Sequence, residues 1–148
     1  MTDAASALQQ KIRASIPLSS AMQFSIAELG LDAIVVSAPL QANVNIHGTG
    51  FAGSIYSLAV LSGWALCMHI MDELDMDGDL VVGKAEIRYR SAVRGDLLCR
   101  TGVSSLQRES FARDFRSRGK AKLVLQVDVG DGPDAVLQAT YVAVSRKI

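Results

Sequence analysis

The feature that most constrains this chain is an uncharged run at residues 51–71, which holds no Asp, Glu, Lys or Arg over 21 positions. A bilayer is crossed by ~20 apolar residues, so the length alone permits a membrane span. However, the run contains serines and His69, and no basic cluster flanks it. A helix that is apolar on every face is equally typical of the buried centre of a globular fold, which we favour, and we expect no membrane partner.

Period-two alternation of apolar and polar residues dominates the remaining sequence and predicts β-strands. One helix precedes them at residues 4–14, and strands are expected at 22–26, 33–36, 85–90, 97–103, 123–129 and 135–144. A single sheet face cannot cover a helix that is apolar all round. We therefore predict an α+β fold in which an antiparallel sheet curls around the helix, and a homodimer, with higher assembly left open.

Composition limits the organisation and the partners. The 148 residues suffice for one domain, expected over 1–148 with an N-terminal helix in 1–16 and the central helix with its preceding loop in 44–74. Fifteen basic and fifteen acidic residues balance, which gives no bulk attraction to nucleic acid. Cys67 and Cys99 lie in apolar stretches and are expected to stay reduced, and the first ten residues do not match a signal peptide, so we expect a cytoplasmic protein.

A glycine-rich loop leads directly into the central helix. It contains Gly48, Gly50 and Gly53, which predict unusual backbone dihedrals or close approach by another group. The first N–H groups of a helix lack intrahelical partners and carry the positive end of the helix dipole. A thioester carbonyl placed on these groups would have its developing negative charge stabilised. The alternative is that the glycines only allow a tight turn.

Two local signatures resemble the hotdog fold of thioesterases and dehydratases. One is Asn45 followed by Gly48-Thr-Gly-Phe-Ala-Gly-Ser54, and the other is the segment 87–96. Residues 45–66 resemble the thioesterase-like group found as a C-terminal domain beside an acetyltransferase domain and also as a free-standing protein. Relatives in that group are malonyl-acyl-carrier-protein decarboxylases of fatty acid metabolism. The resemblance implies a curved sheet wrapped around one long helix and an acyl-thioester substrate, with no cofactor.

The resemblance also implies roles for individual residues. Asn45 would be the catalytic amide, because an amide donates a hydrogen bond without titrating, and the N–H groups of Ala52 and Gly53 would form the oxyanion hole. Asn45 could instead bond its own turn, as asparagine often does. The substrate path would be lined by His47, Thr49, Phe51, Ser54, Ser57, Val60, Arg90 and Ser91.

An absence decides between reactions. Many hotdog thioesterases carry an Asp or Glu about two turns into the helix, and by the resemblance that position falls near Val60 here. Hydrolysis usually needs a general base or a nucleophile. Decarboxylation of a malonyl thioester needs only stabilisation of the enolate oxygen. We therefore predict a malonyl-thioester decarboxylase, with acyl-CoA or acyl-carrier thioesterase and a non-catalytic acyl-thioester binding module as alternatives.

Two further segments are rich in charged residues. Residues 107–122 carry six basic and two acidic side chains, and could attract an acidic carrier protein or the phosphates of coenzyme A. Four of the six are expected to form the binding patch: Arg113, Arg116, Arg118 and Lys120. The alternative is a solvated loop and strand edge. Asp75, Asp77 and Asp79 have the spacing of a calcium loop, but Leu80 stands where that loop needs glycine, so no metal site is expected.

Overall fold

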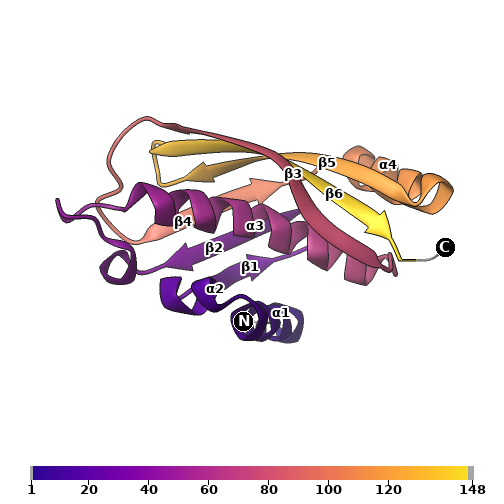
Figure 1. The fold of residues 1–148 in the computed structure, drawn as a ribbon, viewed down its shortest axis with the longest axis horizontal. Helices are drawn as coiled ribbons and strands as arrows, with labels where there is room; N and C mark the ends of the chain where they lie inside the picture. Colours follow the sequence, from indigo (N-terminus) through magenta and orange to yellow (C-terminus); the bar gives the residue numbers. More distant parts are fainter. Residues whose placement is uncertain (1, 147–148) are drawn as a thin grey trace.

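The computed structural model describes residues 2–146 as one curved antiparallel sheet wrapped along a long helix (Figure 1). The strand order is β1-β2-β4-β5-β6-β3. This confirms the predicted α+β fold with a sheet curled around a central helix. The strands are β1 Ser25–Leu29, β2 Ala33–Ala38, β3 Gly78–Tyr89, β4 Leu97–Gly102, β5 Lys120–Val129 and β6 Ala135–Ser145, and the helices are α1 Asp3–Ser15, α2 Pro17–Met22, η1 Leu40–Asn43, α3 Ala52–Glu73 and α4 Ser105–Arg118.

Helix α3 is the core of the molecule. By length and composition it could cross a membrane, but 61% of its most apolar window is buried against the sheet. Leu58, Ala59 and Leu66 are fully buried, and the helix contacts β2, β3, β4, β5 and β6. The helix is thus the buried centre that the uncharged run predicted.

The two edges of the sheet differ. At the β1 edge, the Ile26 backbone N–H donates to Gln9 Oε1 at 2.8 Å, and Arg13 Nε donates to the Phe24 carbonyl at 2.7 Å. Helix α1 therefore covers that edge. Strand β3 forms the other edge and is twelve residues long. It pairs with β6 on one side, and no strand of residues 2–146 pairs with its outer side. Val81 and Val82 on β3 are 52% and 40% exposed, so this edge offers apolar side chains, and the Leu80 carbonyl accepts a hydrogen bond from Trp64 Nε1 at 2.9 Å.

Two α-helices, α2 and α4, were not expected, nor was the short 3₁₀ helix η1. Residues 105–118 form α4, whereas the alternative for this segment was a loop and strand edge, which is wrong. Ser104 and Gln107 form a capping box at its start, and Gly119 ends it with φ of 71°. Helix α2 begins at Pro17, a favourable first helical position, so β1 starts at Ser25 and not at residue 22.

Candidate active site

The loop before α3 is a closed turn held by Asn45. Val44 and Gly50 form an isolated antiparallel bridge, and Gly48 adopts φ of 81°, the left-handed region that favours glycine. Asn45 Oδ1 accepts from the N–H groups of His47 at 2.9 Å and Thr49 at 3.1 Å. Asn45 Nδ2 donates to Thr49 Oγ1 at 2.9 Å and to the Gly50 carbonyl at 3.2 Å.

Both atoms of the Asn45 amide are thus used inside the loop. This is the local turn role weighed above as the alternative to catalysis. A donor role toward substrate requires that a substrate oxygen replace one of the two present acceptors. Thr49 Oγ1 is the replaceable one, since a hydroxyl can rotate away, whereas the Gly50 carbonyl is fixed in the backbone.

The N-terminus of α3 is uncapped. Phe51 is the N-cap residue, and its side chain makes no capping hydrogen bond. Within residues 2–146 the N–H groups of Ala52, Gly53 and Ser54 have no acceptor, whereas the Ile55 N–H already bonds to the Phe51 carbonyl. Ala52 and Gly53 are exposed. A Cβ on Gly53 would lie 2.6 Å from the Phe51 ring, so glycine keeps this ring folded over the helix start.

A neighbouring strand holds the helix start in place. Tyr89, the last residue of β3, donates its hydroxyl to the Ala52 carbonyl at 2.8 Å. Gly50 N–H donates to the Val93 carbonyl at 2.8 Å, which ties the glycine loop to the segment after β3. The three free N–H groups therefore belong to a helix end that is anchored on both sides.

An apolar pocket of about 290 Å³ runs along α3 from its second turn. Helix α2 and the residue before it form the other wall. The lining holds no Asp, Glu, His, Lys or Arg; it consists of Ile16, Leu18, Met22, Tyr56, Ser57, Val60, Leu61 and Trp64. Ser57 and Val60, both predicted to contact substrate, lie in it. Val60, near which the resemblance implied that an acid is missing, is therefore part of an apolar wall.

Tyr141 reaches into α3 beside that wall. Its hydroxyl donates to the Val60 carbonyl at 2.7 Å, so it contacts the backbone of α3 directly. Gly63 leaves the room for it, because a Cβ there would collide with the tyrosine oxygen. Burial raises the pKa of Tyr141, which therefore stays neutral. Tyr141 is 81 positions from Val60 in the sequence, so local sequence patterns could not predict this contact.

The other residues predicted to bind substrate lie either near the start of α3 or away from the pocket. Thr49, Phe51 and Ser54 flank the helix start, and His47 is exposed at the tip of the loop. Ser91 is committed elsewhere, since its hydroxyl donates to Asp134 Oδ1 at 2.6 Å. Arg90 lines a hollow on the outer face of the sheet and does not face the pocket.

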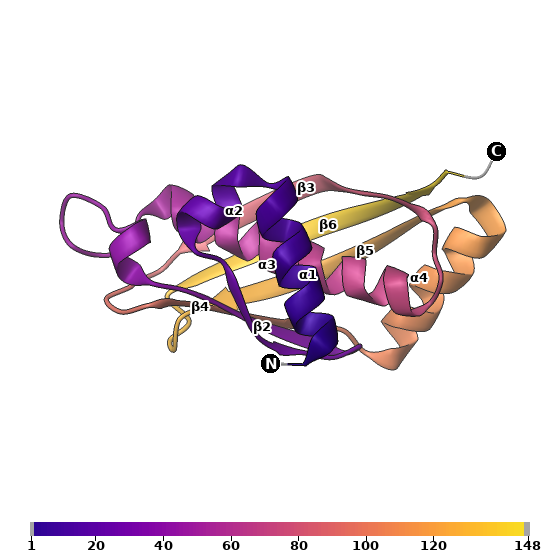
Figure 2. The same ribbon diagram turned by 90° about the horizontal axis from the view of Figure 1, so that it is seen from below.

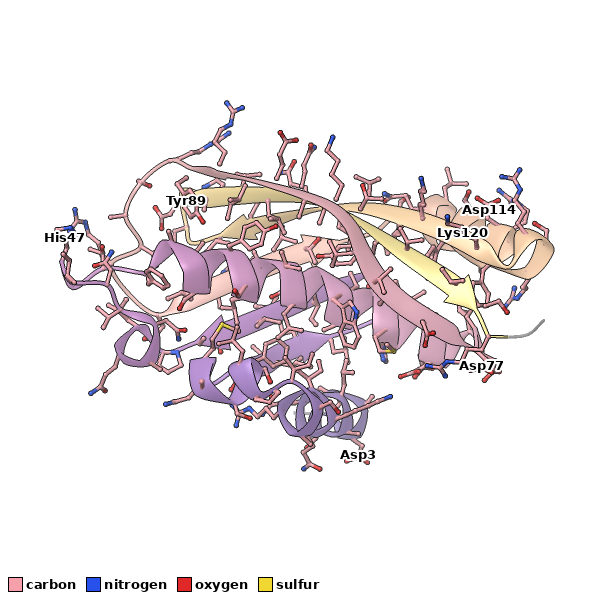
Figure 3. All side chains as sticks on the ribbon, viewed as in Figure 1. Asp3, His47, Asp77, Tyr89, Asp114 and Lys120 are labelled. Atoms are coloured by element: carbon pink, nitrogen blue, oxygen red, sulfur yellow. The ribbon has the colours of Figure 1, made fainter. Side chains whose placement is uncertain are left out.

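The basic segment lies far from this site. Arg113, Arg116 and Arg118 are on α4 and Lys120 begins β5, at the opposite end of α3 from the glycine loop (Figures 2 and 3). A helix of 22 residues is ~33 Å long, which separates the two ends of α3 by that distance. A carrier protein on α4 would therefore not lie over the glycine loop of the same chain.

The cysteines offer no nucleophile. Both thiols are fully buried, and burial raises the pKa of Cys99 to about 12 and that of Cys67 further. The reactive form of cysteine is the thiolate, which these values disfavour. Among the described residues, no group of three or more His, Cys, Asp or Glu side chains is arranged to hold a metal ion.

The curved sheet around a buried helix, with free N–H groups at its start, defines the hotdog class. Solved structures share it. A Shewanella oneidensis protein titled "putative thioesterase" has a TM-score of 0.86 at 32% identity, covering 97% of this chain and 99% of that one. A Chlorobaculum tepidum protein of unknown function has a TM-score of 0.92 at 22% identity (96% and 94% covered), and a Haemophilus influenzae thioesterase has 0.72 at 17% (100% and 95%).

Residues 5–145 match the family described as "Putative thioesterase (yiiD_Cterm)". The chain belongs to this family. The resemblance inferred from the glycine loop is thereby confirmed, and an acyl thioester is the class of substrate that the family name indicates.

Proposed function

We propose that the protein decarboxylates a malonyl thioester of acyl-carrier protein or coenzyme A to the acetyl thioester. One observation carries the proposal: the helix start offers unpaired N–H donors beside a pocket that contains no ionisable carboxylate, imidazole or amine. Such a site can stabilise an oxyanion, but it holds no group that would activate water.

The reaction balances within this site. The bond between C2 and the carboxylate carbon breaks, CO₂ leaves, and the electron pair forms an enolate whose charge falls on the thioester oxygen. The N–H groups of Ala52 and Gly53 hold that oxygen, and Asn45 Nδ2 adds a donor if Thr49 Oγ1 gives way. A proton from solvent then adds to C2. The wall at Val60 solvates the departing carboxylate poorly, which favours its loss as neutral CO₂.

We further propose a cytoplasmic homodimer formed through β3. The β3 edge, with its exposed Val81 and Val82, is suited to pairing with a second copy. Size-exclusion chromatography with light scattering tests this. A Val82→Lys variant is expected to be monomeric, whereas a monomeric parent protein contradicts the dimer.

Thioester hydrolysis is the second candidate. The family description and the titles of the Shewanella and Haemophilus proteins favour it. It requires a base that the described residues do not place in the pocket, so a carboxylate from a second copy would have to supply it. The third candidate, a binding module without turnover, requires only the pocket.

One experiment separates the three candidates. Purified protein is incubated with malonyl, acetyl and longer acyl thioesters of both carriers, and the products are identified by mass spectrometry. Acetyl thioester and CO₂ from the malonyl substrates are expected. Free thiol without CO₂ supports hydrolysis and contradicts our proposal, and tight binding without any product supports the module.

Two variants of Asn45 test how its amide acts. Asn45→Asp keeps the acceptor of the turn but removes the Nδ2 donor, whereas Asn45→Ala removes both. If the donor acts on substrate, both variants lose activity by about 10²-fold, the usual effect of one oxyanion donor. If the amide only holds the turn, Asn45→Asp keeps two of its four turn bonds and loses clearly less activity than Asn45→Ala, and the direct donor role is wrong.

A further inference from the structure

We propose that a hollow on the outer face of the sheet binds the phosphate of the phosphopantetheine arm, the chemical group that coenzyme A and acyl-carrier protein share. The inference rests on the proposed function, because it assigns the far end of the same substrate. The experiment below is chosen so that the two can fail separately.

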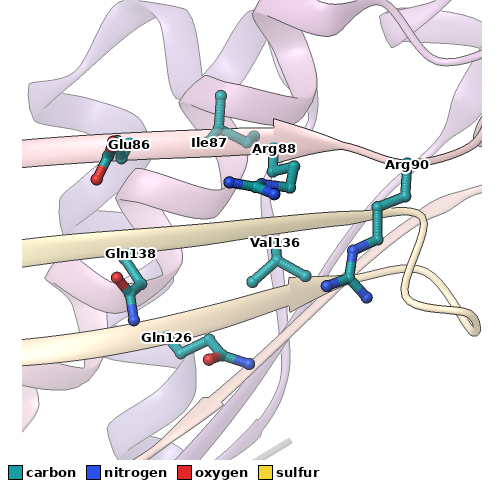
Figure 4. Close-up of a pocket in the computed structure, with 7 residues that line it drawn as sticks. All are labelled: Glu86, Ile87, Arg88, Arg90, Gln126, Val136 and Gln138. Atoms are coloured by element: carbon teal, nitrogen blue, oxygen red, sulfur yellow. The ribbon is translucent and has the colours of Figure 1, made fainter.

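The hollow has a volume of about 180 Å³ and lies over β3, β6 and β5 on the side of the sheet that faces away from α3 (Figure 4). Strand register brings its lining together. Glu86 pairs with Gln138, which in turn pairs with Gln126, and Arg88 pairs with Val136 in the next row. Val136 is short, so it forms a low floor between longer polar side chains.

The charge of the hollow suits a small anion. Arg88 and Arg90 both line it, and Glu86 is the one carboxylate among its lining residues. Within residues 2–146 neither guanidinium is hydrogen-bonded or ion-paired, so both keep their donors free. Arginine presents its donors in a planar fork that matches phosphate oxygens. Gln126 is less available, since its amide donates to Asp128 Oδ1 at 3.0 Å.

The hollow is one strand away from the helix start. Successive side chains of a strand point to opposite faces. Tyr89 points inward and bonds the Ala52 carbonyl beside the free N–H groups, whereas Arg88 and Arg90 on either side of it point outward. Strand β3 is the edge of the sheet and ends at Tyr89. An arm that starts at the helix N-terminus therefore needs to pass only the end of one strand to reach the two arginines.

The site at α4 is the competing place for a phosphate, and the structure disfavours it. Arg116 on α4 already donates to the Leu74 carbonyl at 3.0 Å, and α4 lies at the far end of α3. The outer hollow combines free guanidinium groups with proximity to the helix start, which α4 does not.

The test compares malonyl-phosphopantetheine with malonyl-pantetheine, which differ only in the phosphate. For the parent protein we expect a lower KM for the phosphorylated substrate, and we define the ratio of the two KM values as the phosphate advantage. Arg88→Gln is expected to reduce this ratio about threefold, and the Arg88→Gln/Arg90→Gln double variant about tenfold, as for partly exposed ion pairs. Added salt should reduce it as well.

Lys122→Gln is the matched control, because it removes one positive charge from the same strand system outside the hollow. It should leave the phosphate advantage intact. An equal loss in Lys122→Gln means general charge attraction and overturns the assignment. A parent ratio near one also overturns it, while turnover of both substrates still supports the proposed function.

Malonyl-CoA and malonyl-acyl-carrier protein identify the source of the phosphate. A higher KM of the double variant for both carriers supports recognition of the shared phosphate, and an increase for one carrier alone assigns the hollow to that carrier. If no malonyl thioester is turned over, the proposed function fails. Calorimetry with phosphopantetheine then tests the phosphate site without turnover. Binding to the parent protein that is lost in the double variant supports the site. Equal binding to both proteins, or no binding to the parent, overturns it.

Discussion

The two ends of α3 satisfy their backbone groups in opposite ways. At the C-terminal end, the Met76 N–H bonds to the Met71 carbonyl, Asp75 takes a left-handed φ of 53°, and Arg116 donates to the Leu74 carbonyl. At the N-terminal end, the N–H groups of residues 52–54 remain free. Unpaired backbone donors are stable only where water or a ligand replaces the missing partner.

The surroundings of the two ends of α3 also differ: the C-terminal end is packed and the N-terminal end is open. Around the C-terminal end, Phe115 of α4 packs against Gly78, and the charged side chains stay at the surface. Around the N-terminal end, a glycine loop leaves the helix start open and the adjacent pocket is uncharged. The C-terminal end is therefore expected to carry stability and the N-terminal end reactivity, and substitutions at each should affect only one of the two properties.

The largest effect is expected from Phe115→Ala at the C-terminal end. Phe115 is 7% exposed, and truncating a buried phenylalanine leaves a cavity that costs about 3 kcal/mol of unfolding free energy. For a domain of this size, that lowers Tm by roughly 9 °C. Calorimetry measures the shift, and Leu106→Ala on the same helix, 76% exposed, is the control that should change little. If Phe115→Ala also lost activity per folded molecule, the C-terminal end of α3 would affect reactivity as well as stability, which contradicts this separation of roles.

The second effect belongs to the N-terminal end. In Gly53→Ala the new Cβ lies 2.6 Å from the Phe51 ring, so this ring, which is 53% exposed, must leave its place over the helix start, and the methyl group and the displaced ring are expected to crowd the free N–H groups. We expect kcat to fall about 10²-fold, as for the loss of an oxyanion donor, with Tm nearly unchanged. Gly95→Ala, where a Cβ meets nothing within 4 Å, is the control. Unchanged kcat would show that the helix start does not touch the substrate.

Sequence reasoning recovered the parts of this molecule that local pattern determines. The uncharged run predicted α3, and alternation predicted the strands that surround it, except that β3 begins at Gly78 and not at the predicted residue 85. Helix α4 was missed because its apolar content is low: Phe111, Ala112 and Phe115 are its buried residues, and the signal that marks it is the Ser104–Gln107 capping box. That box was present in the sequence and would have identified the helix start.

The candidate site was only partly predictable. The glycine loop and the free helix start follow from local sequence, as does the absence of an acid near Val60. The pocket does not, because its second wall comes from α2, and the contact of Tyr141 with the Val60 carbonyl spans 81 positions of sequence. The internal use of the Asn45 amide was one of two alternatives, and only side-chain geometry could distinguish them.

A carboxylate placed in the pocket sharpens the contrast between decarboxylation and hydrolysis. Val60→Glu puts a candidate base on the apolar wall, two turns from the free N–H groups. We expect the ratio of free thiol to CO₂ from malonyl thioester to rise by at least about tenfold, since a positioned base typically contributes 10²–10⁴. Burial raises the pKa of such a carboxyl, so hydrolysis should increase with pH. Val60→Gln, similar in shape but without a titrating group, should show neither change.

The smallest effect is expected from the ion pairs beside the C-terminal end of α3. Arg146 lies 3.2 Å from Asp77 and 2.7 Å from Asp79, and these carboxylates raise its pKa. The three side chains are 59% to 67% exposed, so water and salt screen the attraction. Arg146→Gln should therefore leave Tm within experimental error at 0.15 M salt, and kcat unchanged. A clear drop in Tm that disappears at high salt would show that surface charge, and not packing around Phe115, stabilises this end of the helix.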